Sequence, residues 1–292
     1  MARECLRFPE TLRASHSTRA LRERNKARVR GHLVIVSALA LSAATAATAD
    51  EQPICADRPG KSTPACTVPA GDWQVETGFA DWSLQKDRGE RDTSLVLGET
   101  TIKYGMTGSS DLEIDLTPWQ RATSSGRGFR EIASGIGDVK LLYKQQLTPG
   151  DAPLQVTLMP FVKAPTAKHW LGNGKWEGGL LLPIDYAIGK SAFSIELTPE
   201  LDWAADGDGR GHHVAMEQVV SLGWQATDKL NLSAELWSGW DWNPSGTTRQ
   251  ASADGSAAYL LSNDVQLDAG ANFGLNRATP DVELYGGVSV RF

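Results

Sequence analysis

Apolar and polar residues alternate along most of the chain from residue 71 to its end. In the last segment, "DVELYGGVSVRF", Val282 and Leu284 fall on one face, whereas Glu283 and Arg291 fall on the other. A period of two is typical of a β-strand with one apolar and one polar face. The pattern predicts about twelve such strands, at residues 72–82, 94–106, 110–119, 137–147, 154–163, 176–186, 191–203, 214–226, 229–242, 250–261, 265–275 and 281–292.

The segments between these strands alternate in length. The long ones include "QKDRGERD", "PWQRATSSGRGFREIASGI", "APTAKHWLGNGK", "DGDGRGHH" and "NPSGTTRQ", and the short ones are "TGSSD", "TPGDAP", "GKS", "TDK" and "SND". A transmembrane barrel has short periplasmic turns and long outer loops, whereas both ends of a soluble sandwich face the same solvent. Strands of roughly ten residues also have the length that crosses a bilayer when tilted. We therefore predict an all-β fold, a transmembrane antiparallel up-and-down β-barrel of about twelve strands.

Five residues depart from a regular barrel pattern. Pro160, Pro183 and Pro199 fall inside predicted strands. Proline has no N–H to donate to the hydrogen-bond ladder, so we expect bulges or ladder gaps at these positions. Gln145 and Gln218 fall on the apolar face, which indicates local register shifts or positions near the membrane surface.

The charge of the first 49 residues differs from that of the rest. This part holds nine Lys/Arg and three Asp/Glu, against 20 and 32 in the remainder. Its basic residues precede the apolar run "LVIVSALAL", and Ala47 and Ala49 follow at the spacing of a cleavage site. The pattern predicts a secretory signal peptide at residues 1–49, with an apolar run too short to cross a bilayer as a helix. The exported chain is acidic, which disfavours nucleic acid as a partner.

Two cysteines remain after the predicted cleavage. Cys55 and Cys66 flank the segment "ADRPGKSTPA". Export to an oxidising compartment favours a disulfide between them. We expect residues 50–70 to form an N-terminal extension that stays in the periplasm or enters the barrel as a plug, and residues 71–292 to form the barrel.

Three segments carry a resemblance to a known family. They are "CADRPGKSTPACTVPAGDWQVETGF", "GIGDVKLLYKQQL" and "LDAGANFGLNRATPDVELYGGVSVRF". The chain resembles the outer-membrane β-barrel transporter family named for the meta-pathway of phenol degradation. The resemblance implies a channel for small solutes, among them aromatic or other hydrophobic compounds, in the outer membrane of a Gram-negative cell. It implies no catalytic residues and no cofactor.

The end of the chain suggests further partners. Phe292, preceded by alternating apolar residues, resembles the C-terminal signal by which the barrel-assembly machinery recognises its clients. We therefore expect this machinery as a partner, together with outer-membrane lipid and lipopolysaccharide. In the segment "SSGRGFR", Arg127 and Arg130 could lie near lipopolysaccharide phosphates or could simply be solvated.

The polar faces of the predicted strands would line the lumen. Acidic residues outnumber basic ones there, and rings of carboxylates attract cations, so we expect a modest preference for cations. The candidate lining residues are Glu76, Glu113, Asp115, Lys140, Lys144, Glu196, Glu200, Glu235, Asp268, Glu283 and Arg291.

Two other functions remain open at this point. A barrel of this size can be filled by side chains or by a plug, and would then be structural rather than a transporter. An outer-membrane enzyme is less favoured, because the chain has no G-x-S-x-G, H-E-x-x-H or Walker motif, although a Ser-His-Asp set spread over different loops remains open.

One loop has residues that could bind a metal ion. The segment "DWAADGDGRGHH" brings Asp206, Asp208, His212 and His213 close together in sequence. These side chains could hold Ca²⁺ or a transition metal, but the segment lacks the full spacing of an EF-hand. A hydrophilic, glycine-rich loop in water is the simpler interpretation.

Overall fold

In the computed structural model, residues 52–168 and 171–292 are described, so the predicted signal peptide at 1–49 lies outside them. Within these two ranges no helix is long and apolar enough to cross a membrane. The strands are β1 (Trp73–Asp87), β2 (Glu90–Leu97), β3 (Thr100–Thr107), β4 (Ser110–Leu116), β5 (Trp119–Gly126), β6 (Phe129–Gly135), β7 (Val139–Gln146), β8 (Leu154–Ala164), β9 (Glu177–Leu181), β10 (Ile184–Ala187), β11 (Phe193–Ala205), β12 (His212–Gln225), β13 (Leu230–Asp241), β14 (Thr248–Ser262), β15 (Val265–Gly274) and β16 (Val282–Arg291).

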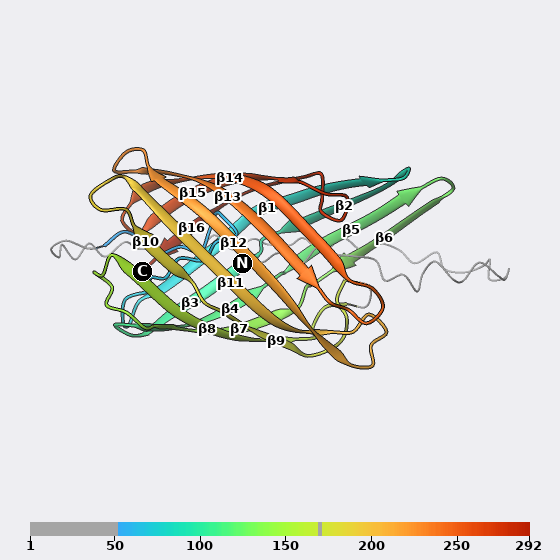
Figure 1. Cartoon of the computed structure of the whole chain (residues 1–292), viewed down its shortest axis with the longest axis horizontal. Coiled ribbons are helices and arrows are strands. Elements are labelled where there is room, and N and C mark those ends of the chain that lie inside the picture. Colours follow the sequence, from blue (N-terminus) through green and yellow to red (C-terminus); the bar gives the residue numbers. More distant parts are fainter. Residues whose placement is uncertain (1–51, 169–170) are drawn as a thin grey trace, which may run out of the picture. The chain divides into compact units, whose positions relative to one another are not determined.

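These segments form a closed antiparallel barrel of 12 strands (Figure 1). Four barrel strands each consist of two segments, namely β2–β3, β4–β5, β6–β7 and β9–β10. For example, β1 pairs with β3 through Trp73↔Tyr104 and with β2 through Asp81↔Val96. Pairing of β1 with β16 closes the sheet. The predicted fold class and strand number are therefore confirmed.

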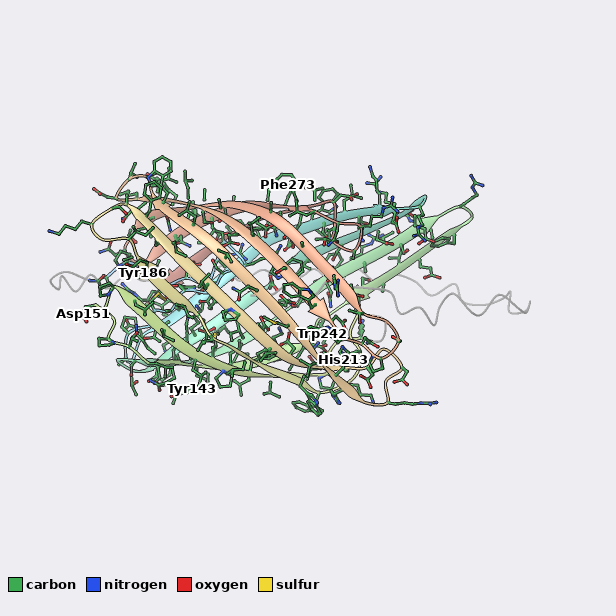
Figure 2. The ribbon with its side chains drawn as sticks, viewed as in Figure 1. Tyr143, Asp151, Tyr186, His213, Trp242 and Phe273 are labelled. Carbon is green, nitrogen blue, oxygen red and sulfur yellow. A yellow bond between two sulfur atoms is a disulfide. The ribbon has the colours of Figure 1, made fainter. Side chains whose placement is uncertain are left out.

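The two faces of the strands have opposite chemistry. In β16, Tyr285, Ser289 and Arg291 are buried, whereas Leu284 on the other face is exposed. Large apolar side chains are exposed all around the barrel, as Figure 2 shows for Phe273. Most of the buried residues are polar or charged, which inverts the distribution of a soluble protein and is typical of a barrel surrounded by lipid.

The segment 118–136 corrects one expectation. It was predicted as a long loop, but most of it forms the hairpin of β5 and β6, which extends past the ends of most other strands (Figure 1). The segment "QKDRGERD" was also predicted as a long loop. It instead continues β1 and β2 to a tight turn, where Arg88 and Gly89 have positive φ. Both hairpins are rich in polar residues because they lie beyond the apolar belt, and the apolar alternation that reveals a strand is therefore missing.

The three prolines share one irregular part of the wall. Regular pairing of β7 with β8 is interrupted near Pro160, and Pro183 lies in the break between β9 and β10. Pro199 lies opposite the same break, where its carbonyl accepts a hydrogen bond from the Leu182 N–H. The expected ladder gaps are confirmed.

The two glutamines on the apolar face differ from one another. Gln145 donates to the carbonyl of Ser109 in a short turn, 3.1 Å away, so it lies at the end of the barrel. Gln218 pairs with Pro199 in regular register in the middle of β12. The expectation of a register shift or an end position is wrong for Gln218, which instead neighbours the proline-containing part of the wall.

Candidate functional site: a charged cavity above an N-terminal plug

The N-terminal segment contacts the inner faces of strands from many parts of the barrel. We call residues 53–70 the plug. Its Ile54 N–H donates to the carbonyl of Asn263 in a short turn, at 2.7 Å, so the plug reaches the end of the barrel that carries the short turns. The predicted disulfide between Cys55 and Cys66 is present and joins the two arms of the segment.

One plug carboxylate is held by two buried lysines. The two Asp57 carboxylate oxygens lie 2.7 Å from Lys103 Nζ and 3.1 Å from Lys144 Nζ. Burial by itself raises the pKa of Asp57, but the two ammonium groups outweigh it and hold the pKa below its usual range. Glu76 accepts hydrogen bonds from the backbone N–H groups of Asp57 and Arg58, both at 3.1 Å.

Two cationic side chains of the plug bind acids of the wall. Arg58 donates two hydrogen bonds to Asp268, at 3.1 and 2.8 Å, in the bidentate geometry that suits a guanidinium. The Nζ of Lys61 lies 2.9 Å from Asp254, and the backbone N–H of Lys61 donates to Glu235 at 2.8 Å. These contacts pair part of the acidic inner wall with plug residues.

The wall is shaped to admit the plug. A Cβ at Gly105 would lie 1.9 Å from the carbonyl oxygen of Pro69, so any larger residue there would displace the plug backbone. Ser62 donates to Glu196 at 2.9 Å and to Glu235 at 2.6 Å, and the Ala65 N–H donates to Asp185 at 2.8 Å. Polar contacts thus hold the plug along its length.

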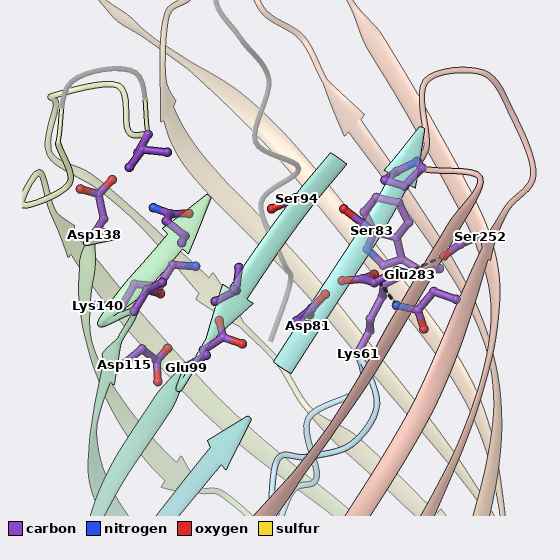
Figure 3. Close-up of a pocket in the computed structure, with 18 of the residues that line it drawn as sticks. Lys61, Asp81, Ser83, Ser94, Glu99, Asp115, Asp138, Lys140, Ser252 and Glu283 are labelled. Atoms are coloured by element: carbon purple, nitrogen blue, oxygen red, sulfur yellow. Dashed lines mark hydrogen bonds between the residues drawn. The ribbon is translucent and has the colours of Figure 1, made fainter. Parts of the chain in front are cut away.

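A cavity of about 150 Å³ lies beside the plug, toward the long loops (Figure 3). Most of the residues that line it are polar or charged, and Val96, Leu171, Trp237 and Pro280 are apolar. Five carboxylates and three ammonium groups line it, which gives a formal net charge of −2. The acids are Asp81, Glu99, Asp115, Asp138 and Glu283, and the bases are Lys61, Lys140 and Lys163.

Several of these charged groups have partners within the wall. Lys163 forms ion pairs with Asp138 and Glu177. Asp115 accepts a hydrogen bond from Thr101 at 2.9 Å, and Glu283 accepts one from Asn272 at 2.6 Å. The carboxylates of Asp115, Asp138 and Glu283 are therefore held in place along the wall of the cavity.

Two lysines also lie over aromatic rings. Lys61 Nζ is 4.7 Å from the centroid of the Trp237 ring. Lys140 Nζ is 4.8 Å from the centroid of the Phe161 ring. A cation over an aromatic face is attracted by the ring quadrupole. These contacts hold ammonium groups and rings together at two places in the inner wall.

The candidate lining residues fall into three groups. Those that line the cavity are Asp115, Lys140 and Glu283. Those that contact the plug or the Asp57 cluster are Glu76, Glu113, Lys144, Glu196, Glu235 and Asp268. The other two are Glu200, which is buried, and Arg291, whose guanidinium pairs with Asp264 beside a short turn.

Sequence reasoning missed two cavity residues on β1. The register of β1 against β16 shifts between Gly78 and Ala80, so Phe79 has no partner on β16. From Ala80 on, the side chains of β1 therefore point to the faces opposite to those that strict alternation predicts. Asp81 and Ser83 consequently line the cavity. Strict alternation would have placed Asp81 on the lipid face together with Phe79, and that conflict was the available signal for a bulge. Asp57, Arg58 and Lys61 were also missed, because an irregular segment has no periodicity to read.

The histidine loop does not gather into a metal site. His213 lies between Asp206 and Asp241, at 2.9 and 2.8 Å. His212 contacts the carbonyl of Trp176, and Asp208 accepts from a backbone N–H of its own loop. Over residues 52–168 and 171–292, no group of three or more His, Cys, Asp or Glu side chains is arranged to hold a metal ion.

Residues 56–292 match the family described as "Putative MetA-pathway of phenol degradation". The chain belongs to this family. The resemblance noted in the sequence is therefore confirmed. No curated protein matches the chain.

The chain is similar to several solved structures. The COG4313 outer membrane channel from Pseudomonas putida F1 is 17% identical with a TM-score of 0.66, over 80% of this chain and 99% of that chain. The translocator domain of the autotransporter NalP from Neisseria meningitidis is 14% identical with a TM-score of 0.48, over 77% of this chain and 90% of that one. The CymD monoaromatic hydrocarbon channel is 11% identical with a TM-score of 0.42, over 77% and 88%. This member of the family is an outer-membrane β-barrel.

Proposed function

We propose that this family member is an outer-membrane channel that passes small solutes through the charged cavity, with a modest preference for cations. The observation that carries the proposal is a charged cavity between the long loops and the plug of a closed barrel. A lumen that served only as a core would be filled by packed side chains. The fold match to the COG4313 outer membrane channel supports the proposal.

Acidic side chains favour the entry of cations from the long-loop end. The inner faces of β1, β2 and β6 carry Asp87, Glu90, Asp92 and Glu131 above the cavity. Below them the cavity itself has a formal charge of −2. Carboxylates along a narrow polar passage raise the local concentration of cations and oppose anions. Lysines on the same wall and dissolved salt reduce this field, so the preference is modest.

The lining also suggests which solutes the cavity accepts. Trp237, Leu171 and Val96 offer apolar surface that can contact a ring or a short alkyl chain. The acids in the same lining favour a neutral or positively charged polar group. Small aromatic compounds without an anionic group therefore suit the cavity best, and aromatic acids suit it poorly.

Passage requires the plug to move or to leave a path at its side. The plug is anchored by buried charges, among them Asp57 with Lys103. These anchors favour a second candidate function, a permanently plugged structural barrel. The two candidates differ in conductance, because a fixed plug that leaves no path at its side blocks ions in every state of the protein.

The proposal assigns no chemical reaction to the chain. The described histidines, His212 and His213, have Trp176 and two aspartates as partners, and within the described residues neither contacts a serine hydroxyl. Hydrolysis by a Ser-His-Asp set needs that contact.

Reversal potentials in planar bilayers test the proposal. Purified full-length protein is inserted under a KCl gradient, first at low and then at high ionic strength. We expect open channels whose reversal potential has the sign of cation selectivity. This potential should move toward zero as salt screens the charges of the wall. A clear anion preference at low salt would contradict the charge assignment. A complete lack of conductance from heat-modifiable, folded protein would favour the plugged barrel instead.

A further inference from the structure

Four strands extend beyond most of the others at the long-loop end, and their charges are sorted by face (Figure 1). We call residues 81–97 and 119–135, which belong to β1, β2, β5 and β6, the extension. Asp81, Ser83, Ser94, Val96 and Gln120 line the cavity and so identify its inner face. Because side chains alternate along a strand, the neighbouring positions point outward, away from the lumen.

The acids point inward and the cations of the strands point outward. The inward acids are Asp81, Asp87, Glu90, Asp92 and Glu131. The outward cations are Lys86, Arg91, Arg121 and Arg130. The other two charged residues of the extension, Arg88 and Arg127, lie in its turns. A face that served only for solubility would mix both signs.

The outward cations lie just above an apolar band. Trp82, Leu95 and Arg121 are cross-strand neighbours, and tryptophan at this position is typical of the membrane interface. Four residues further along the strands, roughly 13 Å away, Lys86 pairs with Arg91. The row continues across Ser125 to Arg130.

These side chains are available for a partner. Lys86, Arg91, Arg121 and Arg130 are all exposed. None of the four forms an ion pair with another residue of the part of the chain that the structure describes. Their level, next to the apolar belt on the long-loop side, is that of the phosphate-bearing headgroups of the outer leaflet.

We propose that the outward face of the extension binds the phosphate groups of lipopolysaccharide. Arginine binds phosphate through two parallel N–H groups, and lysine adds a mobile positive charge. The uncharged row between the cations, which includes Leu84, Thr93 and Thr123, can contact the sugars of the lipid. The binding holds the extension against the membrane surface and does not depend on transport.

A charge-matched pair of variants tests this site. The first variant replaces the outward cations, Lys86→Gln, Arg91→Gln, Arg121→Gln and Arg130→Gln. The control removes the same charge at exposed turns, Arg88→Gln, Lys190→Gln, Arg210→Gln and Lys229→Gln. Purified full-length proteins in detergent are titrated with purified lipopolysaccharide, with the same lipid after enzymatic removal of its phosphates, and with inorganic phosphate.

We expect the first variant to bind phosphorylated lipopolysaccharide on the order of tenfold or more weakly than wild type, and the control to bind almost normally. Wild type should bind the dephosphorylated lipid more weakly than the phosphorylated lipid, by a similar factor. Equal binding by all three proteins, an equal loss in the control, or full competition by inorganic phosphate at matched concentration would overturn the proposal. Heat-modifiable migration verifies folding, and if the fourfold variant does not fold, Arg121→Gln with Arg130→Gln replaces it with the same criteria.

Discussion

At the scale of single residues, one buried aspartate connects the plug to the wall. Asp57 lies between Lys103 and Lys144, which are almost completely buried. Breaking a buried pair leaves the remaining charge without compensation and costs about 3–5 kcal/mol. The plug is therefore sensitive to a single change at this position.

We expect Asp57→Asn to loosen the plug. Backbone amides of residues 53–70 should exchange their hydrogens faster in the variant, while those of the barrel strands keep their protection. Asp151→Asn, at an exposed short turn (Figure 2), serves as the control and should have no effect. Unchanged exchange in the Asp57 variant would contradict the role given to this carboxylate.

The same carboxylate predicts a dependence on pH. The pKa of Asp57 is lowered in the folded protein, so its contribution to plug docking is complete above its ordinary pKa, at about pH 4. The contribution is lost as the pH falls further through the lowered pKa. The protection of the plug amides, which is their exchange rate relative to an unfolded peptide at the same pH, should thus fall in acid below about pH 4, and this fall should be smaller in Asp57→Asn. An equal fall in both proteins would assign it to other groups.

At the scale of elements, the sequence predicted strands within the apolar belt and failed outside it. The alternation of Val282, Leu284 and Val288 in β16 identifies both the strand and its faces, because lipid selects apolar residues on one side. No such selection acts on β5 and β6 in water, so their strands resembled a loop. The bulge at Phe79 and the path of the plug depend on local backbone geometry, and the cavity residues Asp81 and Lys61 were missed for that reason.

The hairpins predict which side of the membrane each turn faces. An epitope inserted at Gly128, in the turn between β5 and β6, should bind antibody on intact cells, because the long connections of a barrel lie outside. The same epitope at Gly189, in a short turn, should require permeabilised cells. Both glycines have positive φ and lie in turns, which makes them comparable sites of insertion. The reverse labelling pattern would contradict the orientation.

At the scale of the whole molecule, the last residue helps to close the barrel. The Phe292 N–H donates to the Trp73 carbonyl at 2.8 Å, and the Trp73 N–H donates to the Phe292 carbonyl at 2.9 Å. Deletion of Phe292 removes both hydrogen bonds and the proposed assembly signal. We expect a severalfold lower level of heat-modifiable barrel in the outer membrane, whereas Phe273→Ala on the lipid face should keep a level near wild type. Equal levels of both variants would refute the assembly role.

A thiol placed in the charged cavity shows whether ions pass through it. Glu283→Cys puts a reactive group in the cavity lining, while the native Cys55 and Cys66 remain joined. A positively charged thiol reagent is then added to single channels in a bilayer, with Ser134→Cys on the outward face of β6 as the control. We expect a lower conductance and a shift of the reversal potential toward the value for anion selectivity for Glu283→Cys alone. Complete modification without a change in either quantity would contradict passage through the cavity.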